Sequence, residues 1–320
     1  MAEIKSVAVL GAGAVGSYVI WGLSQKENIR LGVIADGERA ERLKINGCRI
    51  NQKIYRPEVW NAQEAHGVDL LVVSLKYTAL SGALETIQEA VGADTIVMSL
   101  MNGVDSEERI GEKIGASHVL PALIKVASRR TEDGCQFDPE TTIGIVFGEP
   151  AEPFESERVQ AVSALFADTG IHFRVTEHIQ EEIWSKFRLN VCNNLPQAIL
   201  GAGVGCYQDS IHMQAIRDGL RAELEAIAAA KGIDLSKADG SSTRGSAVAP
   251  SARYSTLQDL DAGRHTEIDM FSGVLMRMGE KLGIPTPYNA YTYHMIKALE
   301  EKNDGLFRYE NKEKIVPHDR

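Results

Sequence analysis

Short apolar runs alternate with amphipathic segments over roughly the first 120 residues of the chain. Runs that are apolar on both faces predict buried strands, and strands joined by helices indicate a parallel sheet covered on both sides. Ligands of such sheets bind at the carboxyl ends of the strands. The predicted strands are residues 6–10, 31–35, 70–74, 95–100 and 118–123, and the helices between them include residues 39–46, 78–91 and 106–114.

The pattern changes after this region. Residues 124–150 lose the helical period and favour antiparallel strands and turns that finish the first sheet. A helix at 156–169 and a strand at 171–175 follow. Nearly every segment beyond residue 176 has helical periodicity, and residues 236–246 are predicted to be a mobile loop. The later predicted helices, two of which end at a glycine as helices often do, are residues 177–199, 211–231, 266–282 and 288–302.

The first predicted strand leads directly into a glycine-rich turn and then a helix. The turn reads Gly11-Ala12-Gly13-Ala14-Val15-Gly16. In dinucleotide-binding sites the first glycine permits the turn, the second lets backbone N–H groups approach a pyrophosphate, and the third lets helix and strand pack closely. Asp36 follows about 20 residues later, where such sites have a ribose-binding group. The alternative is a glycine-rich turn without a ligand.

These patterns predict an α/β fold with two domains. Residues 1–175 are expected to form a Rossmann-type doubly wound parallel sheet that binds the dinucleotide, and residues 176–320 an all-helical substrate and catalytic domain. A chain of 320 residues is long enough for two domains of ordinary size.

Composition and charge exclude several classes of protein. The chain is 44% hydrophobic and 24% charged, as globular proteins usually are, and its net charge of −10 disfavours nucleic acid as a partner. No apolar stretch approaches the roughly 20 residues of a membrane helix, so we expect a cytoplasmic protein. The four cysteines are far apart in sequence, which argues against a zinc site or a disulfide framework and predicts reduced thiols.

Lys186, Asn190 and Asn194 follow one another at intervals of four residues and would form one stripe on a helix. Bulky apolar residues flank them, so a lysine and two carboxamides would be costly to bury without partners. Glu267 is a candidate carboxylate partner. The alternative is a solvent-facing strip. His265, Glu267 and Asp269 do not all face one way on a helix, so no metal site is predicted.

Three separated motifs resemble those of the ketopantoate reductases (2-dehydropantoate 2-reductases). They are the glycine-rich turn at residues 11–16, Lys186-x3-Asn190-x3-Asn194, and Ser255-x-Leu257-Gln258-Asp259 followed by residues 264–269. Their order and spacing hold over nearly the whole chain. The resemblance implies a Rossmann domain and a helical domain with the active site in the cleft between them.

The resemblance also implies residue roles. Lys186 would donate a proton to the substrate's carbonyl oxygen while hydride arrives from the nicotinamide, and Glu267 would be the active-site glutamate. Substrate hydroxyl and carboxylate groups would be bound by Asn190, Asn194 and Ser255. Lys76 and Asn102, after the third and fourth strands, would lie on the cofactor side.

Two positions differ from what is common in the family. Family members often have an Arg-Gly pair that meets the 2′-phosphate of NADPH, where this chain has Asp36-Gly37, and Met101 replaces a more usual glutamine before Asn102. A carboxylate binds a free ribose 2′-hydroxyl and repels a 2′-phosphate, so Asp36 alone favours NADH. Arg39 and Arg42 offer the phosphate a charge in the next helix. NADPH is expected slightly ahead of NADH, because the family resemblance implies NADPH.

The function predicted from the sequence is reduction of ketopantoate to pantoate within pantothenate biosynthesis, with a small-molecule 2-oxo acid as substrate and with neither nucleic acid nor membrane as a partner. One alternative is a reductase of another 2-oxo acid on the same scaffold. A second alternative is a protein that senses NAD(P) without turnover, which would not need both Lys186 and Glu267. An apolar outer face on the helical domain would allow a homodimer.

Overall fold

The computed structural model describes residues 3–131, 134–238 and 248–307. The chain divides into two compact units. The first extends from the amino-terminal strands to Phe187 and also contains residues 231–238. The second begins at Arg188, runs to Ala230 and resumes with the described residues from 248 onwards. The division therefore falls within a helix, whereas the sequence analysis sets the boundary at residue 175.

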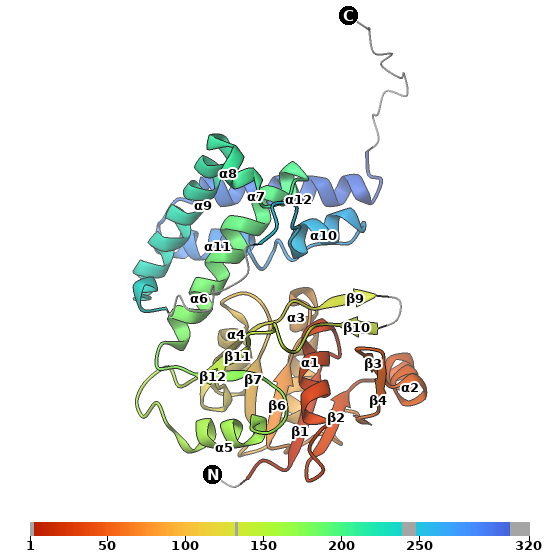
Figure 1. Cartoon of the computed structure of the whole chain (residues 1–320). Coiled ribbons are helices and arrows are strands. Elements are labelled where there is room, and N and C mark those ends of the chain that lie inside the picture. Colours follow the sequence, from red (N-terminus) through yellow and green to blue (C-terminus); the bar gives the residue numbers. More distant parts are fainter. Residues whose placement is uncertain (1–2, 132–133, 239–247, 308–320) are drawn as a thin grey trace, which may run out of the picture. The chain divides into compact units, whose positions relative to one another are not determined.

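A five-stranded parallel sheet forms the centre of the first unit (Figure 1). Its central strand is apolar from Val7 to Leu10, and Val7, Ala8 and Val9 have no exposed surface. A strand buried on both faces is what a parallel sheet covered by helices requires. In the order β5-β2-β1-β6-β7, the strands are β5 (Glu58–Trp60), β2 (Arg30–Ile34), β1 (Ser6–Leu10), β6 (Leu70–Val73) and β7 (Ile96–Ser99).

The helices of this unit connect the parallel strands, as predicted. They are α1 (Ala14–Leu23), α2 (Gly37–Asn46), α3 (Tyr77–Ala90) and α4 (Ser106–Ile114). Helix α1 contacts β1 and also a second, smaller sheet. There Tyr18 packs edge-on against Phe137, with ring centroids 5.2 Å apart. The aromatic contact fixes the helix that begins at the glycine-rich turn.

The fifth strand of the parallel sheet differs from the prediction. Residues 118–123 do not form it: Ala116–His118 is a short 3₁₀ helix (η1), Val119 makes only an isolated bridge to Val97, and Ala122 and Leu123 begin a strand of another sheet. The fifth strand is β5, which pairs in parallel with β2 at one edge of the sheet. Strand β5 has three residues, which is too short for a recognisable alternation of apolar and polar positions in the sequence.

Two smaller sheets complete the first unit. The antiparallel pairings predicted for residues 124–150 occur, but the strands form separate sheets instead of extending the parallel one. Their orders are β4-β3-β10-β9 and β12-β11-β8. The strands are β3 (Cys48–Ile50), β4 (Lys53–Tyr55), β8 (Ala122–Lys125), β9 (Arg129–Thr131), β10 (Gly134–Gln136), β11 (Gly144–Phe147) and β12 (Phe173–Val175).

A close backbone approach holds the three-stranded sheet together. Gly144 has φ +96°, and a Cβ there would lie 1.9 Å from the carbonyl oxygen of His172. Only glycine permits this contact, which brings β11 beside β12 after helix α5 (Glu157–Phe166). The helix predicted at 156–169 and the strand predicted near 171–175 are both present, and both are shorter than predicted.

Helices make up the described part of the second unit. Its elements are the end of α6 (Ile179–Leu189), η2 (Asn190–Asn194), α7 (Leu195–Leu200), α8 (Cys206–Asp209), α9 (Ile211–Ala230), α10 (Ser255–Asp261), α11 (Ser272–Leu282) and α12 (Pro287–Asn303). The buried carboxylate of Glu223 in α9 accepts hydrogen bonds from the backbone N–H groups of Tyr288 and Asn289. It thereby caps the amino end of α12. Among the described helices, none is both long and apolar enough to cross a membrane.

Two helix predictions need correction. The single helix predicted at 177–199 is interrupted by a π-helical turn at Asn190–Asn194. The helix predicted to start at residue 266 starts at Ser272, because residues 267–270 form a turn in which the carbonyl oxygen of Glu267 accepts from the N–H groups of Met270 and Phe271. Of the predicted loop at 236–246, residues 239–246 lie outside the described residues, and Leu235–Lys237 is a short 3₁₀ helix (η3).

Candidate active site

Two glycines of the turn after β1 are required by packing. Gly11 has φ +108°, and a Cβ there would lie 2.6 Å from the carbonyl oxygen of Ser74. A Cβ on Gly16 would lie 2.0 Å from the carbonyl oxygen of Gly11. The hydroxyl of Ser74 also donates to that oxygen at 2.7 Å. These contacts bind the turn tightly to the end of β6.

Gly13 differs from both neighbouring glycines. A Cβ at this position would meet no atom of the described protein within 4 Å, although the residue has an ordinary negative φ of −86°. It caps α1, whose first residues are Ala14 and Val15, and the first-turn N–H groups of a helix attract anions. The open space beside this helix end fits the pyrophosphate of a dinucleotide.

Asp36 lies at the end of β2 and caps the amino end of α2. Its side chain is exposed and makes no capping hydrogen bond. Arg39 and Arg42 are exposed on the first turns of the same helix. Both an acceptor for a ribose hydroxyl and two cations therefore lie on one short stretch after the second strand.

Lys76 and Asn102 follow neighbouring strands of the parallel sheet. Lys76 is exposed at the start of α3, directly after β6, and Asn102 is partly buried after β7. The two strands pair in parallel, with Val73 opposite Ser99. Both residues therefore lie at the carboxyl edge, where ligands of such sheets bind.

Lys186 meets this edge. Its Nζ donates a hydrogen bond of 2.9 Å to Oδ1 of Asn102, and the side chain is partly buried. The neighbouring residues Ile183 and Phe187 are buried. The solvent-facing alternative for Lys186 is therefore wrong: its ammonium group bonds to a carboxamide at the end of the sheet.

The helix that carries Lys186 is fixed to the first unit by a buried charge. Glu182, one turn before Lys186, is 1% exposed. Its carboxylate accepts from Nη2 of Arg174 at 2.5 Å, and Nζ of Lys125 lies 3.9 Å away. Because a buried carboxylate without cationic partners is costly, these contacts hold α6 in one register on β8 and β12.

In the second unit, the π-helical turn contains Asn190 and Asn194. Nδ2 of Asn194 lies 3.5 Å from Oδ1 of Asn190, and Asn194 is 7% exposed. Pro196 lacks the N–H group that would bond to the carbonyl of residue 192, which explains why the regular helix is interrupted here. Such turns are frequent at functional sites.

The remaining predicted site residues also lie in the second unit. Ser255 is the first residue of α10 and is exposed, and Glu267 is partly buried in the turn before α11. Lys186 and Asn102 lie in the first unit. The predicted joint action of Lys186 with Glu267 stays a prediction. The described residues contain no group of three or more side chains that suits a metal ion.

Sequence reasoning missed an unusual carboxylic acid near the sheet edge. Glu107 lies in the first turn of α4, after the loop that carries Asn102, and accepts a hydrogen bond of 2.8 Å from the Ser106 hydroxyl. Burial raises the pKa of Glu107 to about 7. The only sequence signal is a pair of acidic residues, Glu107 and Glu108, which is ordinary at a helix start.

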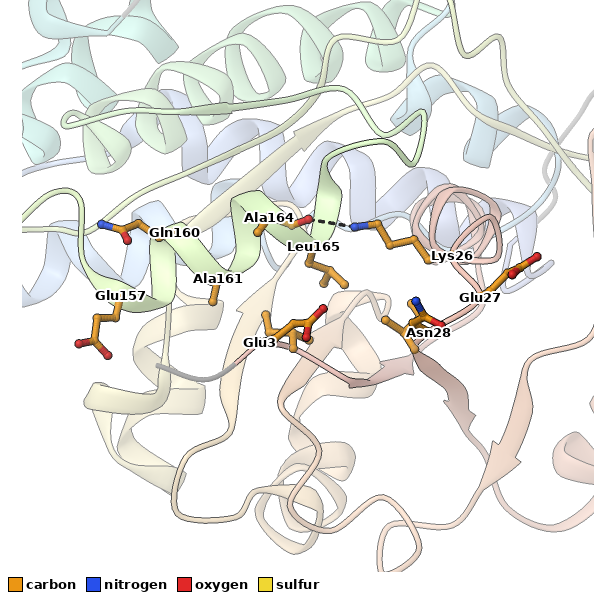
Figure 2. Close-up of a pocket in the computed structure, with 11 residues that line it drawn as sticks. Glu3, Lys26, Glu27, Asn28, Glu157, Gln160, Ala161, Ala164 and Leu165 are labelled. Atoms are coloured by element: carbon orange, nitrogen blue, oxygen red, sulfur yellow. Dashed lines mark hydrogen bonds between the residues drawn. The ribbon is translucent and has the colours of Figure 1, made fainter.

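One depression in the first unit lies away from these residues. It has a volume of about 450 Å³ and borders the start of β1 and helix α5 (Figure 2). Nζ of Lys26 donates to the carbonyl oxygen of Ala164 there, at 2.9 Å. Since Ile4 and Ile29 place it by the amino ends of the strands, it is not the dinucleotide site.

The fold and the site define an NAD(P)-dependent oxidoreductase acting on CH–OH groups. A family model described as "Ketopantoate reductase PanE/ApbA" matches residues 7–148, and one described as "Ketopantoate reductase PanE/ApbA C terminal" matches residues 178–300. The chain therefore belongs to the ketopantoate reductase family.

Several curated proteins are similar over almost their whole length. The 2-dehydropantoate 2-reductase of Caulobacter vibrioides is 29% identical over 92% of this chain and 99% of its own, and that of Pyrococcus horikoshii is 27% identical over 93% and 99%. A solved PanE/ApbA family ketopantoate reductase from Ralstonia eutropha has a TM-score of 0.78 at 24% identity and covers 94% of this chain and 100% of its own.

A solved D-mandelate dehydrogenase, in a ternary structure with NADH and anilino(oxo)acetate, shares the same fold. Its TM-score is 0.79 at 19% identity, covering 94% of this chain and 99% of its own. At this identity the likeness concerns the fold alone.

Proposed function

We propose that the chain is a 2-dehydropantoate 2-reductase that reduces the C2 carbonyl of ketopantoate to the alcohol of pantoate, in pantothenate biosynthesis. The observation that carries the proposal is the hydrogen bond from Lys186 to Asn102 at the carboxyl edge of the sheet. It brings a proton donor to the edge at which a dinucleotide would lie. Membership of the family supports the choice of substrate.

Reduction of a ketone needs a hydride and a proton. A bound nicotinamide cofactor would supply the hydride, and the carbonyl oxygen would then need a proton as the C–O double bond is reduced. In our proposal the Lys186 ammonium group donates its proton to this oxygen and is left as a neutral amine, which regains a proton from solvent. General acid catalysis of this kind contributes about 10²- to 10⁴-fold.

The second unit would bind the substrate. Carboxamides of Asn190 and Asn194 and the hydroxyl of Ser255 suit the hydroxyl and carboxylate groups of ketopantoate, because each can donate a hydrogen bond. Glu267 would favour the charged form of Lys186, since a nearby carboxylate offsets the loss of proton affinity that burial causes.

For the cofactor we propose NADPH ahead of NADH, with Arg39 and Arg42 as the partners of the 2′-phosphate. Both arginines are exposed on α2, beside the end of β2. Asp36 works against this choice, because its carboxylate would repel the phosphate and would suit the free 2′-hydroxyl of NADH.

A paired steady-state assay tests substrate and cofactor together. Oxidation of NADPH and of NADH is measured with ketopantoate, 2-oxoisovalerate and 2-oxopantolactone. We expect kcat/KM to be highest for ketopantoate with NADPH. Comparable kcat/KM values for the three 2-oxo compounds would contradict the proposed substrate, and a higher value with NADH would show that Asp36 decides the cofactor.

A further inference from the structure

Glu267 lies in a segment without regular structure. Residues 264–271 connect α10 to α11, and within them the carbonyl oxygen of Glu267 accepts hydrogen bonds from the backbone N–H groups of Met270 and Phe271. Thr266 and Ile268, on either side, are buried at 4% and 0% exposure. Because neither helix nor sheet fixes this backbone, side-chain contacts must set the position of the Glu267 carboxylate.

A buried carboxylate of α12 holds the residue before Glu267. Glu300 is 2% exposed, and its Oε1 accepts two hydrogen bonds of 2.7 Å, from the backbone N–H and the hydroxyl of Thr266. The same hydroxyl accepts from the N–H of Ile268 at 3.2 Å. Glu300 thereby fixes the backbone immediately before and after Glu267.

Lys297 joins Glu300 to a second residue of the segment, Asp269. Nζ of Lys297 donates to Oε2 of Glu300 at 3.3 Å and to Oδ2 of Asp269 at 2.8 Å. Asp269, two residues after Glu267, also accepts from the hydroxyl of Tyr293 at 2.8 Å. Lys297 therefore bridges the contacts on both sides of Glu267, all made by one helix.

Asp269 and Lys297 favour each other's charged form. Burial alone would raise the pKa of Asp269, but the hydrogen bonds from Lys297 and Tyr293 hold it below the usual value. Burial likewise opposes the charged form of Lys297, yet the hydrogen bond to Asp269 and the charge of Glu300 raise its pKa. Partners that keep each other charged form a rigid unit.

We propose that Lys297 and Glu300 of α12 are positioning residues for Glu267, and that they fix its carboxylate for the reduction by holding Thr266 and Asp269. The inference rests on the proposed role of Glu267. Neither residue is required to touch the substrate. Both act through the backbone of the segment that carries Glu267.

The test uses the full-length protein with Lys297→Met, which keeps the apolar stem of the side chain. Lys302→Met, at an exposed position of the same helix, is the matched control. We expect kcat/KM for ketopantoate to fall at least about tenfold in the first variant, with KM for the cofactor within about twofold of the parent. The control is expected to match the parent.

Two further readouts separate positioning from general stability. Amide hydrogen exchange in residues 264–271 is expected to accelerate by about tenfold or more in Lys297→Met, whereas exchange in α9 stays at its parental rate. In a Glu267→Gln background, Lys297→Met is expected to change kcat/KM by no more than about twofold, because residues that act as one unit are not additive. Glu300→Gln is expected to repeat this pattern more weakly.

Three results overturn the proposal, each in a different way. Faster exchange with parental kcat/KM would show that the contacts hold the segment without serving the reaction. Losses that multiply in the double variant would show a structural role independent of Glu267. Parental turnover of Glu267→Gln would remove the role of Glu267 and this inference with it, whereas the reduction itself is judged by the activity of the parent protein.

Discussion

At Gly13 the backbone is open to a ligand, so a single methyl group tests the cofactor site. Gly13→Ala should fold normally, because its φ is negative and a Cβ there meets no protein atom within 4 Å. The methyl group would instead occupy the space of the pyrophosphate. We expect Tm within about 1 °C of the parent and Kd for the cofactor raised at least about tenfold, or about 1.4 kcal/mol. Calorimetry and titration of cofactor fluorescence measure both.

Gly16→Ala is the contrasting control. Its Cβ would lie 2.0 Å from the carbonyl oxygen of Gly11, so the turn and the helix must move apart. We expect a loss of about 2 kcal/mol or more in the free energy of unfolding. A Gly13→Ala variant that binds the cofactor as tightly as the parent would contradict the cofactor site.

The sequence reveals some residues of the candidate site, but not how deeply they are buried or which partners they contact. The glycines of the turn and the stripe from Lys186 could be found from the sequence because spacing alone determines which residues share a turn or a face. The acidity of Glu107 could not, since its raised pKa depends on burial, which only the folded chain creates. The hydrogen bond from Lys186 to Asn102 likewise joins residues far apart in sequence.

Among the elements, we expect the interrupted helix around residue 190 to contribute to substrate binding. We expect Asn190→Ala and Asn194→Ala each to raise KM for ketopantoate about tenfold, since one lost hydrogen bond in a binding site is worth roughly 1–2 kcal/mol. KM for the cofactor should stay at the parental value. Steady-state kinetics with both ligands varied measure the two effects.

Asn193→Ala serves as the control from the same turn. The contacts of Asn193 that hold this turn use its backbone carbonyl, which accepts from the hydroxyl of Tyr207 at 2.7 Å and from Gln197 at 3.1 Å. The substitution leaves this carbonyl in place, so KM for ketopantoate should be close to that of the parent. Equal effects of all three substitutions would mean that the turn matters for stability alone.

Long, strongly patterned elements were predictable, and short or irregular ones were not. Strand β1 has the bounds that the sequence predicts, because its run from Val7 to Leu10 is apolar on both faces, and helix α4 also has its predicted bounds. Strand β5 forms one edge of the parallel sheet with only three residues. The turn at residues 267–270 is held by contacts with α12. Such elements are set by tertiary contacts that no local pattern contains.

For the whole molecule, the raised pKa of Glu107 predicts how stability depends on pH. Between the usual glutamate pKa of 4.5 and the raised pKa of about 7, the folded protein keeps a proton that the unfolded chain releases. Stability from this group is therefore complete at low pH and is lost as pH rises through 7. Glu107→Gln, which cannot ionise, should gain stability relative to the parent between pH 4 and pH 8, by at most about 3 kcal/mol.

Denaturant unfolding at several pH values measures this gain. Glu108→Gln, at an exposed position of the same helix, is the control and should follow the parent at every pH. A Glu107→Gln variant with the same pH dependence as the parent would show that Glu107 titrates normally in the folded protein.

The central claim is that the ammonium group of Lys186 donates the proton in the reduction of a 2-oxo acid, and Lys186→Ala tests it most directly. Turnover of ketopantoate is measured beside the Kd of the cofactor, with Lys281→Ala, at an exposed position of α11, as the control. We predict turnover at least about a hundredfold below the parent, with an unchanged cofactor Kd, as expected for loss of a general acid. Turnover within tenfold of the parent would contradict the account.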